Sequence, residues 1–255
     1  MSVTGDLKGR TAFVTGGSGD IGGAIARALA AWGADVAISY IGHSEGAVAT
    51  TDAVRAAGKR SLAVQLDQRD PASIEAAAGA VFAHFGRVDI LVNNAAWNIG
   101  IPCGALDDLT ADIWDRVLET NLRGPYLLAR AFAPYLRAHG TGRIVNIASL
   151  AGIYPGGSSI AYAASKAGLI HLTRCMAIAL APDVTVNCVA PGLVEGTRMA
   201  QRLPDAVADS ARKQAVLGRT ASAQDIAEQV VTFCRAESVT GQVLVIDSGF
   251  PGGMH

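Results

Sequence analysis

The stretch that decides the fold is TAFVTGGSGDIGGAIARALAAWGADVAISY, residues 11–40. It opens with a short β-rich run at 11–15, which the glycine cluster at 16–23 follows directly. An alanine-rich segment at 24–32 is typical of a helix, and a second β-rich run occupies 35–40. This order of strand, glycine turn, helix and strand predicts a βαβ unit.

The glycine turn reads TGGSGDIG, residues 15–22, and it lies between a predicted strand and a predicted helix. Gly17, Gly19 and Gly22 fit the pattern G-x-G-x-x-G. Glycines let the backbone approach a pyrophosphate closely, and a helix N-terminus offers free N–H groups and a positive dipole end. The turn therefore predicts a bound nucleotide, and an ordinary tight turn between strand and helix is the alternative.

Strands and helices alternate through the rest of the chain without a linker or repeat. Further strands are expected at 61–66, 88–92, 142–148, 184–190 and 242–246. Further helices are expected at 47–57, 71–85, 111–121 running into 122–139, 160–180 and 223–234. The alternation predicts a single α/β domain over residues 1–255, with a Rossmann-type doubly wound sheet of about seven parallel strands and helices on both faces.

Four features directly follow predicted strands: the glycine turn, the asparagine pair at 93–94, Ser149 and the Pro-Gly pair at 191–192. The carboxyl ends of parallel strands share one edge of the sheet, where ligands bind in open α/β folds. We therefore expect all four features to meet at a single site.

Residues 149–166, SLAGIYPGGSSIAYAASK, carry the candidate chemistry. Tyr162 and Lys166 have the i, i+4 spacing that puts both on one face of a helix. An ammonium beside a phenol favours the phenolate, so we expect a lowered tyrosine pKa and a group able to give or take a proton. The Ser149 hydroxyl is placed to hold the reacting oxygen. A half-exposed helix face without catalytic function gives the same Tyr-x-x-x-Lys spacing.

The end of the second strand bears on the choice of cofactor. A carboxylate there binds the ribose 2′-hydroxyl of NAD and repels a 2′-phosphate. The sequence has Tyr40 at this position, and Asp35 lies at the opposite end of the strand. Small and polar residues follow at 42–44, without a nearby arginine or lysine. We predict a preference for NADP(H), with NAD(H) as the alternative.

The composition excludes several other classes. Half of the 255 residues are hydrophobic, 17% are charged, and the net charge is −1, so neither nucleic acid nor a membrane is an expected partner. The N-terminus lacks the apolar segment of a signal peptide, and no apolar run reaches membrane-spanning length. The four cysteines match no metal spacing, so we expect no metal site and a reducing, cytoplasmic location.

Taken together, these motifs resemble those of the short-chain dehydrogenase/reductase family, and the chain is similar to its 3-oxoacyl-(acyl-carrier-protein) reductase-like carbonyl reductases. The resemblance covers essentially the whole chain. Its motifs are TGxxxGxG at 15–22, NNAG at 93–96, an asparagine at 121, Ser149, YxxxK at 162–166, PG at 191–192 and TGQVLVIDSG at 240–249.

The resemblance implies reversible reduction of a ketone to a secondary alcohol by NAD(P)H. In this scheme Tyr162 gives the proton, Ser149 holds the carbonyl oxygen, and Lys166 lowers the tyrosine pKa and binds the nicotinamide ribose. Asn121 is expected to position a water behind Lys166. The family also implies a homotetramer, paired through the long helices at 111–139 and 160–180, with a dimer as the alternative.

The expected cofactor contacts come from loops at the same sheet edge: Gly16, Ser18, Gly19, Asp20, Ile21, Gly22, Tyr40, Ser44, Asp67, Gln68, Asn94, Ala95, Tyr162, Lys166, Pro191, Gly192 and Val194. Asp67 would accept a hydrogen bond from the adenine, with a turn-capping role as the alternative. The chain departs from the family pattern at Asp20, Ala96 and Ser248, where the family has glycine. Thr197 also comes slightly late after the PG pair.

The expected substrate lining is apolar and aromatic: Trp97, Ile153, Tyr154, Leu193, Met199 and Leu203, with residues 193–217 as a lid. The sequence contains no cluster of basic residues that would bind a carboxylate or phosphate group of a substrate. An apolar ketone, a keto ester or a 3-oxoacyl thioester is therefore the expected substrate. The alternatives are a non-catalytic protein that senses a dinucleotide and an epimerase or dehydratase on the same fold.

Overall fold

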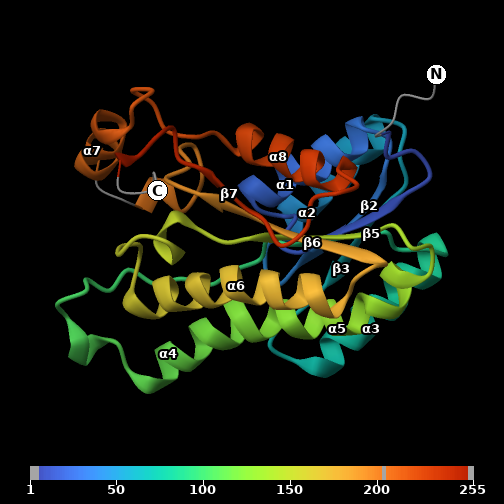
Figure 1. The fold of residues 1–255 in the computed structure, drawn as a ribbon, viewed down its shortest axis with the longest axis horizontal. Coiled ribbons are helices and arrows are strands. Elements are labelled where there is room, and N and C mark those ends of the chain that lie inside the picture. Colours follow the sequence, from blue (N-terminus) through green and yellow to red (C-terminus); the bar gives the residue numbers. More distant parts are fainter. Residues whose placement is uncertain (1–5, 203–204, 252–255) are drawn as a thin grey trace.

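The computed structural model describes residues 6–202 and 205–251, and they contain one seven-stranded sheet between two layers of helices (Figure 1). All neighbouring strands are parallel, in the order β3-β2-β1-β4-β5-β6-β7. The strands are β1 (Thr11–Val14), β2 (Asp35–Tyr40), β3 (Ser61–Gln65), β4 (Ile90–Asn93), β5 (Gly142–Ile147), β6 (Val184–Pro191) and β7 (Val243–Ile246). The predicted doubly wound fold is confirmed.

Helices cover both faces of the sheet (Figure 1). One layer holds α1 (Asp20–Ala31), α2 (Ser44–Ala56) and α8 (Ala223–Arg235). The other holds α3 (Pro71–Phe85), α4 (Ala111–Leu118), α5 (Gly124–Arg137) and α6 (Ile160–Ala179), while α7 (Asp205–Gln214) lies beyond one end of the sheet. Short helical turns are η1 (Leu106–Asp108), η2 (Glu119–Arg123), η3 (Leu150–Gly152) and η4 (Ala200–Arg202). No helix among the described residues is long and apolar enough to cross a membrane.

The strands divide their side chains between two buried clusters, as a period of two requires. On β2, Val36 and Ile38 pack toward α1 and α8, whereas Ala37 packs on the opposite face. Phe13 of β1 stacks on Phe132 of α5 with ring centroids 5.0 Å apart. Apolar strands buried on both faces in this way are characteristic of a parallel sheet between helices.

The predicted boundaries differ from the structure mainly at helix starts. The first helix begins at Asp20 instead of residue 24, and the second at Ser44 instead of residue 47. Gly22 and Gly23 are buried inside α1, so packing outweighs the weak helix propensity of glycine. The predicted helix at 111–139 contains the π-helical segment η2, whose altered bonding pattern has no signal in the sequence.

Candidate active site

The strand order reverses between β1 and β4, which is where an open α/β sheet forms its ligand crevice. Here the Thr15 hydroxyl accepts hydrogen bonds from the N–H groups of Asn94 and Ala95, each at 3.0 Å. The Asn94 amide donates to the Thr15 carbonyl at 2.9 Å. These bonds hold the glycine turn and the loop after β4 together at the switch point, and the cofactor contacts of Asn94 and Ala95 stay predictions.

The glycine turn is shaped for close approach by a phosphate. Gly16 has a φ of 64°, in the left-handed region that favours glycine. A Cβ on Gly22 would lie 2.3 Å from the Gly16 carbonyl oxygen, so only glycine permits this contact between turn and helix. Gly19 caps α1 without any side-chain hydrogen bond. The first N–H groups of α1 are thus free of side-chain caps, an arrangement that fits a pyrophosphate.

The predicted adenosine end contains two side chains that already have partners. Asp67 forms an ion pair with Arg69 at 2.6 Å, and the adjacent guanidinium lowers the pKa of the Asp67 carboxyl. The Gln68 amide donates to the carbonyls of Ala95 at 3.0 Å and Thr120 at 2.6 Å. Both of its N–H groups are therefore used by the protein. These donors tie loops of the sheet edge together, so a cofactor contact by Gln68 would use its other groups, and that contact stays a prediction.

Tyr40 and Ser44 flank the short loop between β2 and α2. Tyr40 is half-buried, and Ser44 is the first residue of α2. Between them, His43 Nδ1 lies 2.9 Å from the Ser18 carbonyl oxygen. This contact joins the loop to the glycine turn, so the end of β2 borders the proposed phosphate site.

Tyr162 and Lys166 lie one turn apart on α6, and both are buried. Lys166 Nζ donates to the Ile147 carbonyl at 2.8 Å and lies 5.6 Å from the centroid of the Tyr162 ring. Ser149 lies two residues after the end of β5, and its hydroxyl accepts from the Ala151 N–H at 3.2 Å. The structure thus brings together the three residues that the sequence proposes as a catalytic group, and it removes the half-exposed alternative.

The pKa values of this group differ from the expectation. Burial raises the pKa of Tyr162, and a hydrogen bond with Ser149 opposes that rise without reversing it. Burial also lowers the pKa of Lys166 to about 8. The prediction of a depressed tyrosine pKa is therefore wrong for the polypeptide alone, because desolvation of the phenolate dominates and the ammonium is directed to the Ile147 carbonyl.

Asn121 lies in the π-helical segment η2 and is buried. Its Oδ1 accepts from the Trp97 N–H at 2.8 Å, while Nδ2 donates to the Trp97 carbonyl at 2.9 Å and to the Ser165 hydroxyl at 3.2 Å. The side chain therefore holds the loop after β4 against α6. Its predicted contact with a water stays a prediction.

A buried polar network behind the site has no signal in the sequence. The Asn93 side-chain amide donates to Asn146 Oδ1 at 2.8 Å, and Asn146 Nδ2 donates to the Thr173 hydroxyl at 3.0 Å. Because these residues belong to β4, β5 and α6, the network fixes the position of α6 relative to the strand ends. It thereby positions Tyr162 and Lys166 without contacting the site.

The predicted substrate lining is partly assembled. Trp97 packs in a cluster with Tyr162, and the Arg116 guanidinium lies 4.2 Å from the centroid of its ring. Tyr154 meets Phe250 edge-on at 5.7 Å, a C-terminal neighbour that the sequence did not indicate. Leu193 is half-buried, Ile153, Tyr154 and Met199 are exposed, and Leu203 lies outside the described residues.

The Pro-Gly corner after β6 is tightly held. The Gly192 N–H donates to the Ile246 carbonyl at 2.8 Å, and a Cβ on Gly192 would lie 2.9 Å from that of Asp247. Pro191 is buried at the end of β6, and the Val194 side chain belongs to the core beside α1 and α8. Any cofactor contact from Val194 is therefore limited to its main chain.

The segment predicted to be a lid, residues 193–217, is held by several hydrogen bonds and ion pairs among its described residues. Glu195 pairs with Arg212 of α7 at 2.7 and 2.9 Å, and the Thr197 hydroxyl donates to the Val194 carbonyl at 2.8 Å. The Leu217 N–H donates to the carbonyl of Ser248 at 3.1 Å. Ser248 has a φ of 59°, so its backbone keeps the left-handed conformation that suits the glycine of the family pattern.

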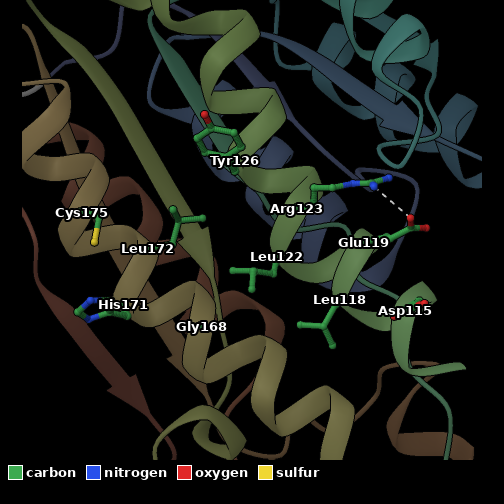
Figure 2. Close-up of a pocket in the computed structure, with 10 residues that line it drawn as sticks. All are labelled: Asp115, Leu118, Glu119, Leu122, Arg123, Tyr126, Gly168, His171, Leu172 and Cys175. Carbon is green, nitrogen blue, oxygen red and sulfur yellow. Dashed lines mark ion pairs between the residues drawn. The ribbon is translucent and has the colours of Figure 1, made fainter. Parts of the chain in front are cut away.

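One hollow in the described part of the chain lies away from these residues. Its volume is about 640 Å³, and it lies between α6 and the continuous helix α4–η2–α5 (Figure 2). None of the predicted catalytic or cofactor residues lines it. No group of three or more potential metal ligands occurs within 6–202 and 205–251.

A sequence profile of the family described as Enoyl-(Acyl carrier protein) reductase matches residues 17–251. The 3-oxoacyl-(acyl-carrier-protein) reductase of Escherichia coli (strain K12) is 38% identical over 248 residues, which cover 96% of this chain and 98% of that protein. This chain belongs to the short-chain dehydrogenase/reductase family. The family assignment makes it an oxidoreductase that uses a nicotinamide dinucleotide to interconvert carbonyl and alcohol groups.

Two further members of the short-chain dehydrogenase/reductase family illustrate the range of relatives. Cis-4-hydroxycyclohexanecarboxylate dehydrogenase of Sinomonas cyclohexanicum is 37% identical over 244 residues, covering 94% of this chain and 96% of that protein. A short chain dehydrogenase from Burkholderia cenocepacia J2315, solved in complex with NADP, is 42% identical with a TM-score of 0.86. That alignment covers 96% of this chain and 98% of the solved one.

Proposed function

We propose that this enzyme reduces apolar ketones, keto esters or 3-oxoacyl thioesters to secondary alcohols and prefers NADP(H) to NAD(H). The observation that carries the proposal is the buried Tyr162–Lys166 pair, held beside the crevice where β1 and β4 diverge. A buried phenol and ammonium at the ligand edge of an α/β sheet are a typical device for proton transfer.

Each residue of the pair and its neighbours has a separate task. Tyr162 donates its proton to the substrate oxygen in reduction and accepts one in oxidation, and the Ser149 hydroxyl holds that oxygen as charge develops on it. With the dinucleotide bound, Lys166 would bind the ribose hydroxyls and favour the phenolate electrostatically, against the rise in the Tyr162 pKa that burial causes. Asn121 keeps Trp97 and the loop after β4 in place. The bound dinucleotide supplies the hydride.

The proposed dinucleotide site follows the edge of the sheet. The turn from Gly16 to Gly22 binds the pyrophosphate, and Asn94 and Ala95 line the crevice beside it. The backbone after β6 covers the nicotinamide end. The described residues form one catalytic unit in this account, with 193–217 as its lid. The two exposed and two buried cysteines are all free, which supports a cytoplasmic location.

Three observations support the preference for NADP(H). The end of β2 has Tyr40 where an NAD-binding carboxylate would stand. The thirteen-residue helix α2 begins at Ser44, so its positive end faces this region. The relative from Burkholderia cenocepacia was solved with NADP.

The apolar character of the lining supports the proposed substrates. Ile153, Tyr154 and Met199, which are predicted to line the substrate site, are exposed, and so are Val216 and Leu217 at the end of the predicted lid. The names of the two curated relatives specify an acyl thioester and a cyclic hydroxy acid. A non-catalytic dinucleotide sensor would not need the buried pair, and an epimerase or dehydratase of this fold would need a larger substrate region after the PG pair.

Replacing Tyr162 with phenylalanine tests the catalytic proposal. We expect Tyr162→Phe to bind NADPH as the wild type does and to lose about 10²- to 10⁴-fold in kcat, because only the transferable proton is removed. Cofactor binding is followed by nicotinamide fluorescence, and kcat with a panel of ketones. An enoyl thioester is assayed in parallel, to distinguish reduction of a carbonyl group from reduction of a carbon–carbon double bond. Wild-type kcat in the variant would refute the assignment.

Replacing Tyr40 with aspartate tests the cofactor preference. We expect the wild type to have a higher kcat/KM with NADPH than with NADH. Tyr40→Asp should reverse this order, because a carboxylate repels the 2′-phosphate and binds the 2′-hydroxyl. Tyr40→Phe is the matched control and should keep the wild-type preference. Equal or better wild-type rates with NADH would contradict the proposal.

We further propose a homotetramer that pairs through the hollow between α4–η2–α5 and α6. Figure 2 shows apolar side chains from both sides of it, including Leu118, Leu122 and Leu172. Light scattering should give about four times the chain mass of 26.1 kDa. Tyr126→Glu in this hollow should lower that mass, because an unpaired charge would be buried on association. Val48→Glu, on the opposite helix layer, is the control. A wild-type mass of 26.1 kDa would contradict the proposal.

A further inference from the structure

The departure from the family's glycine pattern at Asp20 has a partner 178 residues away in the chain. The Asp20 carboxylate accepts a hydrogen bond from the main-chain N–H of Arg198 at 2.8 Å. Arg198 Nε lies 3.7 Å from the same carboxylate oxygen. A residue of the lid is thus attached directly to the first turn of α1.

The Arg198 guanidinium lies over the glycine turn. Its Nη2 is 3.4 Å from the position that a Cβ on Gly19 would occupy. Gly19 is the N-cap of α1 and provides no side chain of its own there. The lid therefore brings a positive charge to the position from which a side chain at residue 19 would begin.

Charge explains why the two residues occur together. A carboxylate in the first turn of α1 stabilises the helix but opposes the binding of an anion at the same helix end. Both side chains are well exposed, with relative exposures of 49% for Arg198 and 38% for Asp20, so their ion pair contributes little to folding. Arginine carries five N–H donors, and those of its Nη groups suit phosphate oxygens.

We propose that Arg198 binds the pyrophosphate of the dinucleotide and that Asp20 is the residue that positions it. The inference rests on the proposed function, because it requires that the turn binds a dinucleotide. The pyrophosphate is favoured over the 2′-phosphate because Gly19 caps the helix end that faces a pyrophosphate, whereas the 2′-phosphate belongs beside Tyr40. The lid is thereby coupled to occupancy of the cofactor site.

Titrations of Arg198→Met test the proposal, because methionine keeps the apolar stem and removes the charge. NADPH and NADH are titrated by nicotinamide fluorescence, and ADP-ribose by competition. We expect all three to bind about tenfold more weakly, the loss of one charge-assisted contact. Lys213→Met is the control, since it removes an exposed positive charge from α7 of the same lid, and its affinities should match those of the wild type.

The possible outcomes are distinct. Weaker binding of NADPH alone would assign Arg198 to the 2′-phosphate and overturn the pyrophosphate proposal. Affinities equal to those of Lys213→Met would also overturn it. A wild type that bound none of the three ligands would refute the proposed function itself, and this inference with it.

A second variant tests whether Arg198 offsets the charge of Asp20 at the phosphate site. Once Arg198 is replaced, the Asp20 carboxylate stands unneutralised at the phosphate site. Adding Asp20→Ala to Arg198→Met should therefore recover at least about threefold in dinucleotide affinity, following the Coulomb repulsion removed. If the pair were merely structural, the second substitution would leave the affinity unchanged or weaken it further, and that result would overturn the proposal that the two charges act together at the pyrophosphate.

Discussion

The hydrogen bond from Lys166 Nζ to the Ile147 carbonyl is the interaction on which the site depends. An ammonium buried this deeply needs a polar partner, and the end of β5 supplies it. The bond also sets the register between β5 and α6. Ser149 lies two residues beyond Ile147, and Tyr162 lies one turn before Lys166, so a single contact brings the hydroxyl and the phenol to the same place.

Two further side-chain hydrogen bonds hold α6 in this register. Asn146, next to Ile147, binds Thr173 further along α6, and Asn121 binds Ser165 next to Lys166. The crevice for the dinucleotide is built separately, through the bonds of Thr15 with the loop after β4. Asn121 joins the two constructions, because it also holds Trp97 in that loop. Buried hydrogen bonds between main chain and side chains therefore connect the catalytic residues with the cofactor site.

Much of the fold and the edge of the site could be predicted from the sequence. The pattern of residues 11–40 predicts the βαβ unit, and the alternation of apolar strands with helices predicts a parallel sheet. The spacing of Tyr162 and Lys166 predicts a shared helix face, and the polar residues that follow strands predict their meeting place. These features depend on local periodicity, which a sequence displays directly.

The remaining features depend on contacts between distant segments. The rise in the Tyr162 pKa follows from burial, which the spacing to Lys166 does not reveal. The Gln68 side chain donates hydrogen bonds to loops that are distant in the chain. Arg198 contacts Asp20 although 178 residues separate the two in the chain. None of these leaves a pattern in neighbouring residues.

The measurement that tests the central claim most directly is the pH dependence of alcohol oxidation in the wild type and in Lys166→Met. Oxidation needs Tyr162 as phenolate, so its rate rises as the pH passes the apparent pKa of the coupled pair. Loss of the ammonium disfavours the phenolate, and we predict that the midpoint moves upward by at least about one pH unit, with a lower rate below it. An unchanged midpoint in Lys166→Met would contradict the account.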